Sequence, residues 1–498
     1  MDAELTVETP SGRLRGTPSP HARNGTVVVH RGIPYAQAPF GEHRFAAPAP
    51  PVPFDGVRDC TAPGPPAPQG ELLIGAAGWT PDTPRECLIL NVWSSVRAGE
   101  NAPVLVWIHG GAYLVGSASE PTYDGTRLAE TGLVVVGINY RVGFEGFGHV
   151  PGRPDNRGLL DQIAALRWVR ENIASFGGDP GNVTVAGESA GAGSVAALMA
   201  MPDARGLFHR AIAHSPPGDM MRTETARLVS ERFAEVLGVP LEAEALAALP
   251  PEKIVAATEE VLTRTDSQGR RSRSLTCFAP VVGGPELPEA PLDVIARGDV
   301  SDIDLLTGHN LHEYRLFSEL GQDVRVNDEE ALLRKAARIG LGAGEVAAYR
   351  EVHPALSPRD LYVSVMGDAM FGEFTLRLAE THAAAGGRAH VFRLALESPA
   401  LGGRLGACHA LDLPLAFGTL ESDLGAFLFD GAPTDAHRAL SRRIMGAWRD
   451  FATGGDAGWS PVSAGATPVK VWDEVDELYA HDPSPVRHIW RGLPMGPK

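Results

Sequence analysis

The sequence predicts an α/β fold in which a mostly parallel central sheet carries helices on both faces. Two short, apolar runs rich in β-branched residues, at 104–108 (VLVWI) and 133–138 (LVVVGI), are typical of buried parallel strands. Further strands are expected at 182–187 and 209–214, and helices at 159–176 and 190–201. Strands and helices that alternate in this way favour parallel βαβ units.

The second half of the chain is predicted to be more helical. Mainly helical patterns occupy about 220–296 and 328–370, and strands are expected at 302–307 and 389–396, the latter as the last buried strand. No internal repeat or linker divides residues 1–498, so we expect a single domain. The two helical stretches are interpreted as insertions over one face of the sheet, where they form part of a pocket.

Composition excludes several classes of function. A formal net charge of −17 argues against a nucleic-acid partner, which requires a basic surface. No apolar run is long enough to span a membrane. The first residues are acidic and polar, unlike a secretory signal, which favours a cytoplasmic location. The cysteines are too scattered for a disulfide framework or a structural zinc site, and we expect free thiols at Cys60, Cys87, Cys277 and Cys408.

The motif that carries chemistry is G-x-S-x-G at 187–191, between an expected strand and an expected helix. In this context the serine stands on a sharp turn, and the flanking glycines remove side chains that would collide there. The free N–H groups at the start of the following helix face the serine. This arrangement predicts that Ser189 is the nucleophile of an α/β-hydrolase fold.

A serine nucleophile needs a base, and the base needs an acid that orients it. In this fold the partners follow in the order serine, acid, histidine. Glu313 comes shortly after the strand expected at 302–307, and His409 follows the strand expected at 389–396 and a glycine-rich turn. The loop His109-Gly110-Gly111-Ala112 follows the strand at 104–108, where backbone donors of an oxyanion hole are expected.

These motifs resemble the type-B carboxylesterases, a family that includes cholinesterases and bacterial para-nitrobenzyl esterases. The resemblance runs from about residue 12 to 490 and is densest at 87–93 (CLILNVW), 103–125 and 158–215. It implies a carboxylic ester hydrolase with an acyl-enzyme on the serine, no cofactor, no metal and a small-molecule ester as substrate. It leaves the oligomeric state open. The implied roles are nucleophile, acid and base for Ser189, Glu313 and His409, oxyanion donors for Gly111, Ala112 and Ala190, support of the triad for Glu188 and Ser215, and a buried salt bridge for Arg141 and Asp161.

The chain departs from the family pattern at four places. Arg85-Glu86 replaces a Glu-Asp pair and reverses a charge expected to pair with Arg44, so either Glu86 substitutes or the bridge is absent. Cys60 is out of register with the usual disulfide partner of Cys87. Glu145 stands where the family has an apolar residue and would alter substrate preference if it reached the pocket. Pro216 replaces a glycine after Ser215.

Three other functions compete with ester hydrolysis as an interpretation of the sequence. A metal site at 309–313 (HNLHE) is disfavoured, because zinc-protease motifs need two histidines one turn apart on a helix. A non-catalytic interaction module is disfavoured by the intact triad. An acyltransferase or a tailoring enzyme of a biosynthetic pathway would use the same acyl-enzyme, and the motifs do not separate it from a hydrolase. The resemblance of the loop at 109–113 to the family's Gly-Gly-Gly/Ala-x type also implies room for esters of tertiary alcohols, since Gly110 and Gly111 have no side chain and Ala112 has one methyl group.

Overall fold

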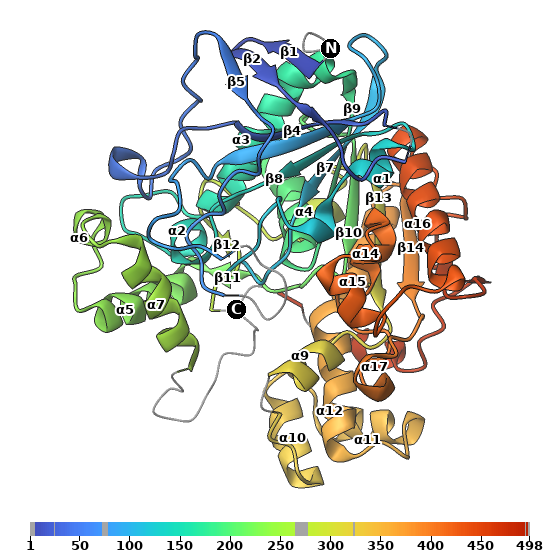
Figure 1. Ribbon diagram of the computed structural model, residues 1–498. Coiled ribbons are helices and arrows are strands. Elements are labelled where there is room, and N and C mark those ends of the chain that lie inside the picture. Colours follow the sequence, from blue (N-terminus) through green and yellow to red (C-terminus); the bar gives the residue numbers. More distant parts are fainter. Residues whose placement is uncertain are drawn as a thin grey trace.

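An eleven-stranded mixed sheet forms the centre of the molecule (Figure 1). The computed structural model describes residues 5–23, 25–71, 78–263, 277–321, 324–493 and 495–496. The run from β15 to β8 is parallel throughout, and the pairings outside it are antiparallel, which confirms the predicted fold class. In spatial order the strands are β16 (Glu477–Tyr479), β15 (Val469–Trp472), β14 (Ala389–Leu394), β13 (Asp304–Asn310), β10 (Arg210–His214), β9 (Gly178–Glu188), β7 (Ala102–Ile108), β8 (Val134–Ile138), β6 (Ile89–Ser94), β4 (Val28–Pro34) and β3 (Thr17–Pro18).

Two small sheets and a series of helices surround the central sheet. One small sheet contains β1 (Thr6–Thr9), β2 (Gly12–Arg15) and β5 (Val57–Asp59), and the other contains β11 (Met221–Arg222) and β12 (Val281–Val282). The α-helices are α1 (Thr126–Ala129), α2 (Gly143–Phe147), α3 (Arg157–Asn172), α4 (Ala190–Ala200), α5 (Thr223–Leu237), α6 (Ala243–Ala247), α7 (Pro251–Thr263), α8 (Pro291–Ala296), α9 (Arg315–Leu320), α10 (Glu329–Ala337), α11 (Ala343–Val352), α12 (Pro358–Gly367), α13 (Glu373–Ala384), α14 (Asp412–Phe417), α15 (Asp423–Leu428), α16 (Asp435–Gly454) and α17 (Arg487–Trp490).

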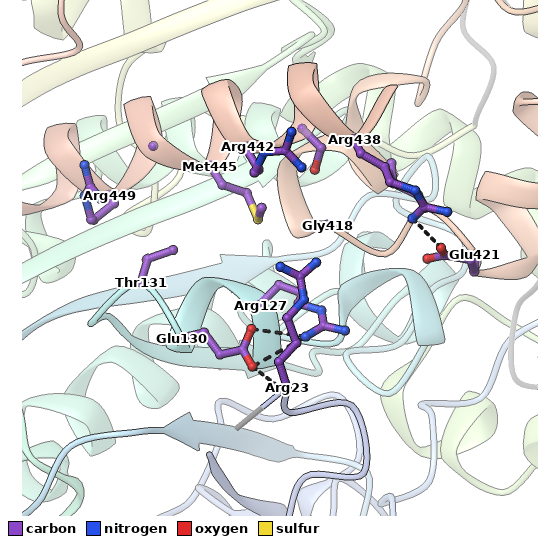
Figure 2. A pocket seen from close by; sticks show the side chains of 13 residues that line it. Arg23, Arg127, Glu130, Thr131, Gly418, Glu421, Arg438, Arg442, Met445 and Arg449 are labelled. Atoms are coloured by element: carbon purple, nitrogen blue, oxygen red, sulfur yellow. Dashed lines mark hydrogen bonds and ion pairs between the residues drawn. The ribbon is translucent and has the colours of Figure 1, made fainter. Parts of the chain in front are cut away.

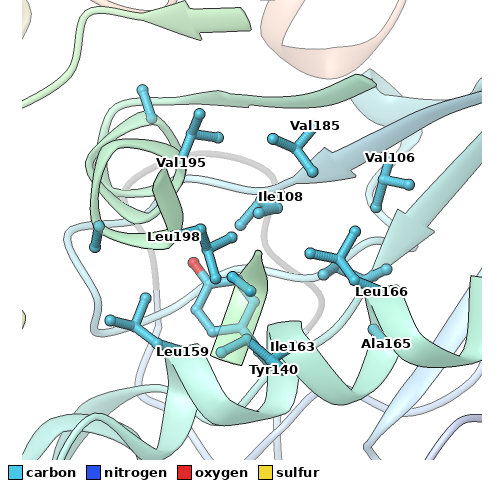
Figure 3. Packing of buried hydrophobic residues seen from close by; sticks show 14 of the residues in the cluster. Val106, Ile108, Tyr140, Leu159, Ile163, Ala165, Leu166, Val185, Val195 and Leu198 are labelled. Carbon is cyan, nitrogen blue, oxygen red and sulfur yellow. The ribbon is translucent and has the colours of Figure 1, made fainter. Parts of the chain in front are cut away.

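Both faces of the parallel strands are buried, because successive side chains of a strand point to opposite faces and each face has its own helices. On one face, Val106 and Ile108 of β7 pack with Leu159 and Leu166 of α3 and Val195 of α4 (Figure 3). On the other face, Leu105 and Trp107 of the same strand pack against α14 and α16. Two-sided burial explains why these strands are continuous apolar runs in the sequence.

The predicted strands and helices of the first half lie where they were expected. The helix expected at 159–176 is α3 followed by a 3₁₀ turn, Ile173–Phe176, and it ends at Gly177, whose φ of 86° is left-handed. One prediction is wrong: β14 is not the last buried strand, because β15 pairs with it in parallel. The run at 469–472 (VKVW) is only four residues long and contains a lysine, so its apolar signal is weak.

The two helical stretches are present in the described residues. The first contains α5–α8 together with β11 and β12, although its part at 264–276 lies outside the described residues. The second contains α10–α12 and leads through a π-helical turn, Asp368–Gly372, into α13. Figure 1 shows α5–α7 and α10–α12 at opposite lower sides of the molecule. Among the described residues there is no helix long and apolar enough to cross a membrane.

All four cysteines are free and buried. Burial raises the pKa of Cys60 to about 11 and the pKa values of Cys87 and Cys277 to about 12. A thiol held in its protonated form is a poor nucleophile, so these thiols are chemically passive.

Arg44 does not pair with Glu86, so of the two expected alternatives the structure agrees with the absence of that bridge. Nε and Nη2 of Arg44 donate to Oε1 of Glu145 at 3.0 and 2.6 Å, with both side chains buried. Glu86 instead pairs with Arg58 at the surface. The negative charge that Arg44 needs is therefore supplied by Glu145.

The same guanidinium joins a helical insertion to the core. Nη1 of Arg44 donates to the carbonyl oxygens of Ala247, at 3.0 Å, and Leu249, at the end of α6. Glu145 lies on α2 and is held by Arg44 rather than left free. The pair thus links the segment after β4, α2 and the first helical stretch.

We expect Glu145→Gln to lower the free energy of unfolding by about 3–5 kcal/mol, because it leaves a buried guanidinium without its counter-charge. Urea denaturation measures the change. Glu86→Gln is the matched control: its pair with Arg58 is partly exposed, so its loss costs about 1 kcal/mol or less. Equal losses for the two variants would contradict this account of the buried pair.

Candidate active site

Ser189 occupies a strained turn between β9 and α4, with φ 55° and ψ −127°. The turn has no space for a side chain at Gly187 or Gly191. A Cβ on Gly187 would lie 2.5 Å from the carbonyl carbon of Gly191, and a Cβ on Gly191 would lie 2.1 Å from the carbonyl oxygen of Ile108. Ser189 itself is only half-buried, so its hydroxyl is accessible at the carboxyl end of the sheet.

The loop after β7 packs directly against this turn. A Cβ on Gly110 would lie 3.2 Å from Cβ of Ser189 and 2.8 Å from Oε2 of Glu188. Gly111, Ala112 and Tyr113 follow with φ values of 109°, 56° and 61°, a run of left-handed residues. The N–H groups of Leu114 and Val115 donate to the carbonyl oxygen of Gly111 and close the turn.

His109 anchors the start of this loop. Its ring stacks on Tyr140 with centroids 4.3 Å apart, and Tyr140 donates its hydroxyl proton to the carbonyl oxygen of His109 at 2.7 Å. Burial lowers the pKa of His109 to about 4, so the ring is neutral at physiological pH. The histidine therefore has a positioning role for the loop and carries no charge toward the serine.

Three backbone N–H groups near Ser189 have no acceptor within the described part of the chain: those of Gly111, Ala112 and Ala190. Ala190 is the first residue of α4, so its N–H points out of the helix at the positive end of the helix dipole. Unpaired donors beside an accessible serine are suited to stabilise an oxyanion.

The carboxyl ends of β13 and β14 bring Glu313 and His409 together. Nδ1 of His409 donates to Oε2 of Glu313 at 2.5 Å, and both side chains are buried. The other carboxylate oxygen, Oε1, accepts from the hydroxyl of Ser215 at 2.5 Å and from the N–H of Asn310 at 2.6 Å. Both oxygens of Glu313 are therefore fixed, and with them the orientation of the imidazole.

The second ring nitrogen of His409, Nε2, faces Glu188, the residue before Ser189. Nε2 lies 3.0 Å from Oε1 of Glu188, outside hydrogen-bond geometry. Burial lowers the pKa of His409, but the carboxylates of Glu188 and Glu313 outweigh it and raise the pKa to about 9. Burial raises the pKa of Glu188 to about 8, although His409 opposes this shift. The rings of Phe317 and Phe371 pack on the imidazole, at 5.1 and 4.5 Å between centroids.

A second buried histidine–carboxylate pair, which the sequence did not reveal, supports the turn that carries His409. Nδ1 of His214 donates to Oδ2 of Asp412 at 2.5 Å, and Nε2 accepts from the indole N–H of Trp448 at 3.1 Å. Asn310 donates to Oδ1 of Asp412 at 3.0 Å and to the carbonyl oxygen of Cys408 at 2.8 Å. In the sequence, the only signal for this pair was the position of Asp412, three residues after His409.

Other expected residues also lie where they can support the site. Arg141 and Asp161 form a bidentate pair, 1% and 0% exposed, with Nη2 to Oδ1 at 2.7 Å and Nε to Oδ2 at 2.8 Å. Ser215 has a φ of 49°, so the residue before Pro216 is left-handed. His309 lies in β13 and His312 beyond its end, so they do not share a helix as the zinc-protease motif would require.

Comparison with known proteins gives a consistent result across the whole chain. The model of the carboxylesterase family matches residues 3–481. The para-nitrobenzyl esterase of Bacillus subtilis is 38% identical over 459 residues, which cover 90% of each chain. The phenmedipham hydrolase of Pseudarthrobacter oxydans is 36% identical over 447 residues, 86% of this chain and 87% of that protein. The solved structure of the Geobacillus stearothermophilus carboxylesterase EST55 superposes with a TM-score of 0.86 at 34% identity, over 98% of this chain and 100% of that chain.

Proposed function

The chain belongs to the carboxylesterase family and is a serine hydrolase of carboxylic esters, and on that premise we propose that it acts through an acyl-enzyme on Ser189. The observation that carries the proposal is the buried 2.5 Å bond from His409 to Glu313, which leaves Nε2 of the imidazole facing the Ser189 turn. A base oriented in this way can take the serine proton.

Each step of the reaction has a residue to perform it. Nε2 of His409 takes the hydroxyl proton as Oγ of Ser189 attacks the ester carbonyl, and Glu313 stabilises the imidazolium that results. The N–H groups of Gly111, Ala112 and Ala190 bind the oxyanion. The imidazolium then gives its proton to the leaving alcohol, which departs and leaves the acyl group on the serine. Water, activated by His409, attacks the acyl-enzyme and releases the acid.

A panel of p-nitrophenyl esters of increasing chain length, assayed with added methanol or a primary amine, tests this function. Hydrolysis predicts that the free acid is the main product at every chain length. An acyl group transferred mainly to the added alcohol or amine would favour the alternative, an acyltransferase that uses the same acyl-enzyme.

We also propose that the first helical stretch forms part of the substrate pocket. A cavity of about 90 Å³ lies between the end of the 109–115 loop, α2 and α7, and its lining includes Leu114, Phe144 and Ile254. The ion pair with Arg44 holds Glu145 in place in the lining of this cavity.

Four free, protonated thiols fit a reducing compartment, which supports a cytoplasmic location.

The carboxylates of Glu188 and Glu313 raise the pKa of His409, so the acid limb of the pH–rate profile is expected above the ordinary histidine pKa of 6.5. Only neutral imidazole can act as the base, so kcat/KM falls as the pH drops through the raised pKa of His409. Glu188→Gln removes one of the two carboxylates that raise this pKa and should move the limb to lower pH by about one unit or more.

The control for this shift is Glu86→Gln, which removes a carboxylate at the surface pair with Arg58. Its profile should match that of the wild type. An unmoved limb in Glu188→Gln would show that the charge of Glu188 does not act on His409.

The oxyanion loop is expected to admit esters of tertiary alcohols. Gly110 and Gly111 have no side chain, and Ala112 contributes one methyl group beside the reacting carbonyl. The φ of 56° at Ala112 makes a β-branched replacement such as valine a poor test, because the backbone itself would be strained. Asparagine tolerates this conformation and adds bulk.

The wild type should therefore hydrolyse tert-butyl acetate measurably, and Ala112→Asn should lose about tenfold or more on it relative to ethyl acetate. Ala112→Gly is the matched control and should retain both activities. Equal losses on the two esters would indicate a damaged oxyanion hole instead of a steric effect.

A further inference from the structure

A cavity of about 280 Å³ that contains none of the proposed catalytic residues is lined by arginines from three separate parts of the chain. Arg23 comes from the loop between β3 and β4, Arg127 from α1, and the others from α16. Figure 2 shows Arg23 and Arg127 together on one side of the cavity and the side chains of α16 on the other. The charged residues that line it are Arg23, Arg127, Arg438, Arg442, Arg449, Glu130 and Glu421.

Not all of these guanidinium groups are neutralised within the protein. Arg127 pairs with Glu130 at 3.1 Å, and Arg438 pairs with Glu421 at 2.6 Å. Arg449 pairs with its neighbour Asp450 at 2.7 Å. Arg23 and Arg442 have no carboxylate partner for their guanidinium groups among the residues that the structure describes. The cavity therefore has an excess of positive charge.

This excess is unusual for the chain, which has 44 basic and 61 acidic residues. On α16, Arg438, Arg442 and Arg449 are four and seven residues apart and so lie along one face of the helix. A solvated helix face would explain these three arginines but not the convergence of Arg23 and Arg127 on the same cavity. Arg23, Arg442 and Arg449 are exposed and solvated, and an anion in the cavity would be attracted by three segments of the chain at once.

We propose that this cavity binds a small phosphorylated ligand at a site separate from the esterase centre. The planar guanidinium fork matches two phosphoryl oxygens at once, and Arg23 and Arg442 provide two such forks that no carboxylate of the described residues pairs with. Met445, Leu420 and the small residues Gly418 and Gly446 give an apolar wall for the organic part of the ligand. The volume is at the low end for ligand pockets, which limits the ligand to a phosphoryl group with a small body.

Calorimetric titration of the full-length protein with inorganic phosphate and with pyrophosphate, at constant ionic strength, tests the proposal. We expect saturable one-site binding, with pyrophosphate the tighter ligand because it presents more charge. Arg23→Gln and Arg442→Gln should each raise the Kd about tenfold or more, since each removes charge-assisted hydrogen bonds. Arg227→Gln, which removes an exposed arginine of α5, is the matched control and should bind like the wild type.

Ester hydrolysis by every variant should remain at the wild-type level, which shows that the protein is folded and separates this proposal from the proposed catalytic mechanism. The proposal is overturned if neither anion binds saturably, or if Arg227→Gln weakens binding as much as Arg442→Gln. Equal affinity for citrate and pyrophosphate would overturn the preference for phosphoryl groups. Binding to vesicles of anionic lipid without binding of either free anion would also overturn it.

Discussion

Replacing Ser189, His409 or Glu313 singly with alanine is expected to lower kcat by about 10⁴-fold or more. The expectation follows from the geometry, in which the carboxylate of Glu313 fixes an imidazole whose Nε2 lies 3.0 Å from Glu188, the residue before Ser189. If the three side chains act as one unit, as we propose, the losses should not add: the triple variant should be about as slow as Ser189→Ala. Steady-state kinetics with p-nitrophenyl acetate gives the values.

Circular dichroism must show that each variant is folded, and His21→Ala provides a control for the loss of an exposed histidine. The assignment of Glu313 as the acid of the triad is tested by Glu313→Ala. Glu313→Ala that turned over at a near-normal rate while folded would show that another carboxylate orients His409. Glu188 is the nearest candidate, since its Oε1 lies 3.0 Å from Nε2.

The second large effect is expected from the oxyanion loop. Gly111→Ala should lower kcat by about 10²–10³-fold on every ester, because it displaces the backbone donors that we propose bind the oxyanion. The added Cβ would lie 2.1 Å from the carbonyl oxygen of Val115, and the φ of 109° is unfavourable for alanine. The loop must therefore shift, and the N–H groups of Gly111 and Ala112 shift with it.

Gly132→Ala is the matched control for this substitution. Gly132 has a similar φ of 100°, but a Cβ there would meet nothing within 4 Å. Both variants strain the backbone, and only Gly111→Ala should affect catalysis. A comparable loss of kcat in Gly132→Ala would assign the effect to general destabilisation.

Local patterns in the sequence were sufficient to predict the parallel centre of the fold. The strands β7 and β8 are apolar over nearly their whole length because helices cover both of their faces, so each gives a clear signal. In β9 only the second half is fully buried, and the signal comes from that half. The strand β15 was missed because it lies near the edge of the sheet and is short. Antiparallel strands such as β4 have no strong pattern of their own, and their places depend on pairing with distant segments.

The candidate site was predictable where it depends on strand ends. Parallel strands bring Ser189, Glu313 and the loop at 109–113 to one edge, so order along the chain was enough. Contacts between side chains far apart in sequence were not predictable. The sequence offered Glu86 as the candidate partner of Arg44, and only the fold places Glu145 against it. The pair of His214 and Asp412, 198 residues apart, is of the same kind.

The most direct test of the central claim is the chemical identity of the acylated residue. The protein is mixed with p-nitrophenyl acetate, quenched in acid within the first turnover, digested and mapped by mass spectrometry, with Ser189→Ala as control. We predict one acetyl group per molecule, on Ser189, and none in the variant. An acetyl group on another residue, or rapid release of both products by Ser189→Ala, would contradict the acyl-enzyme on Ser189.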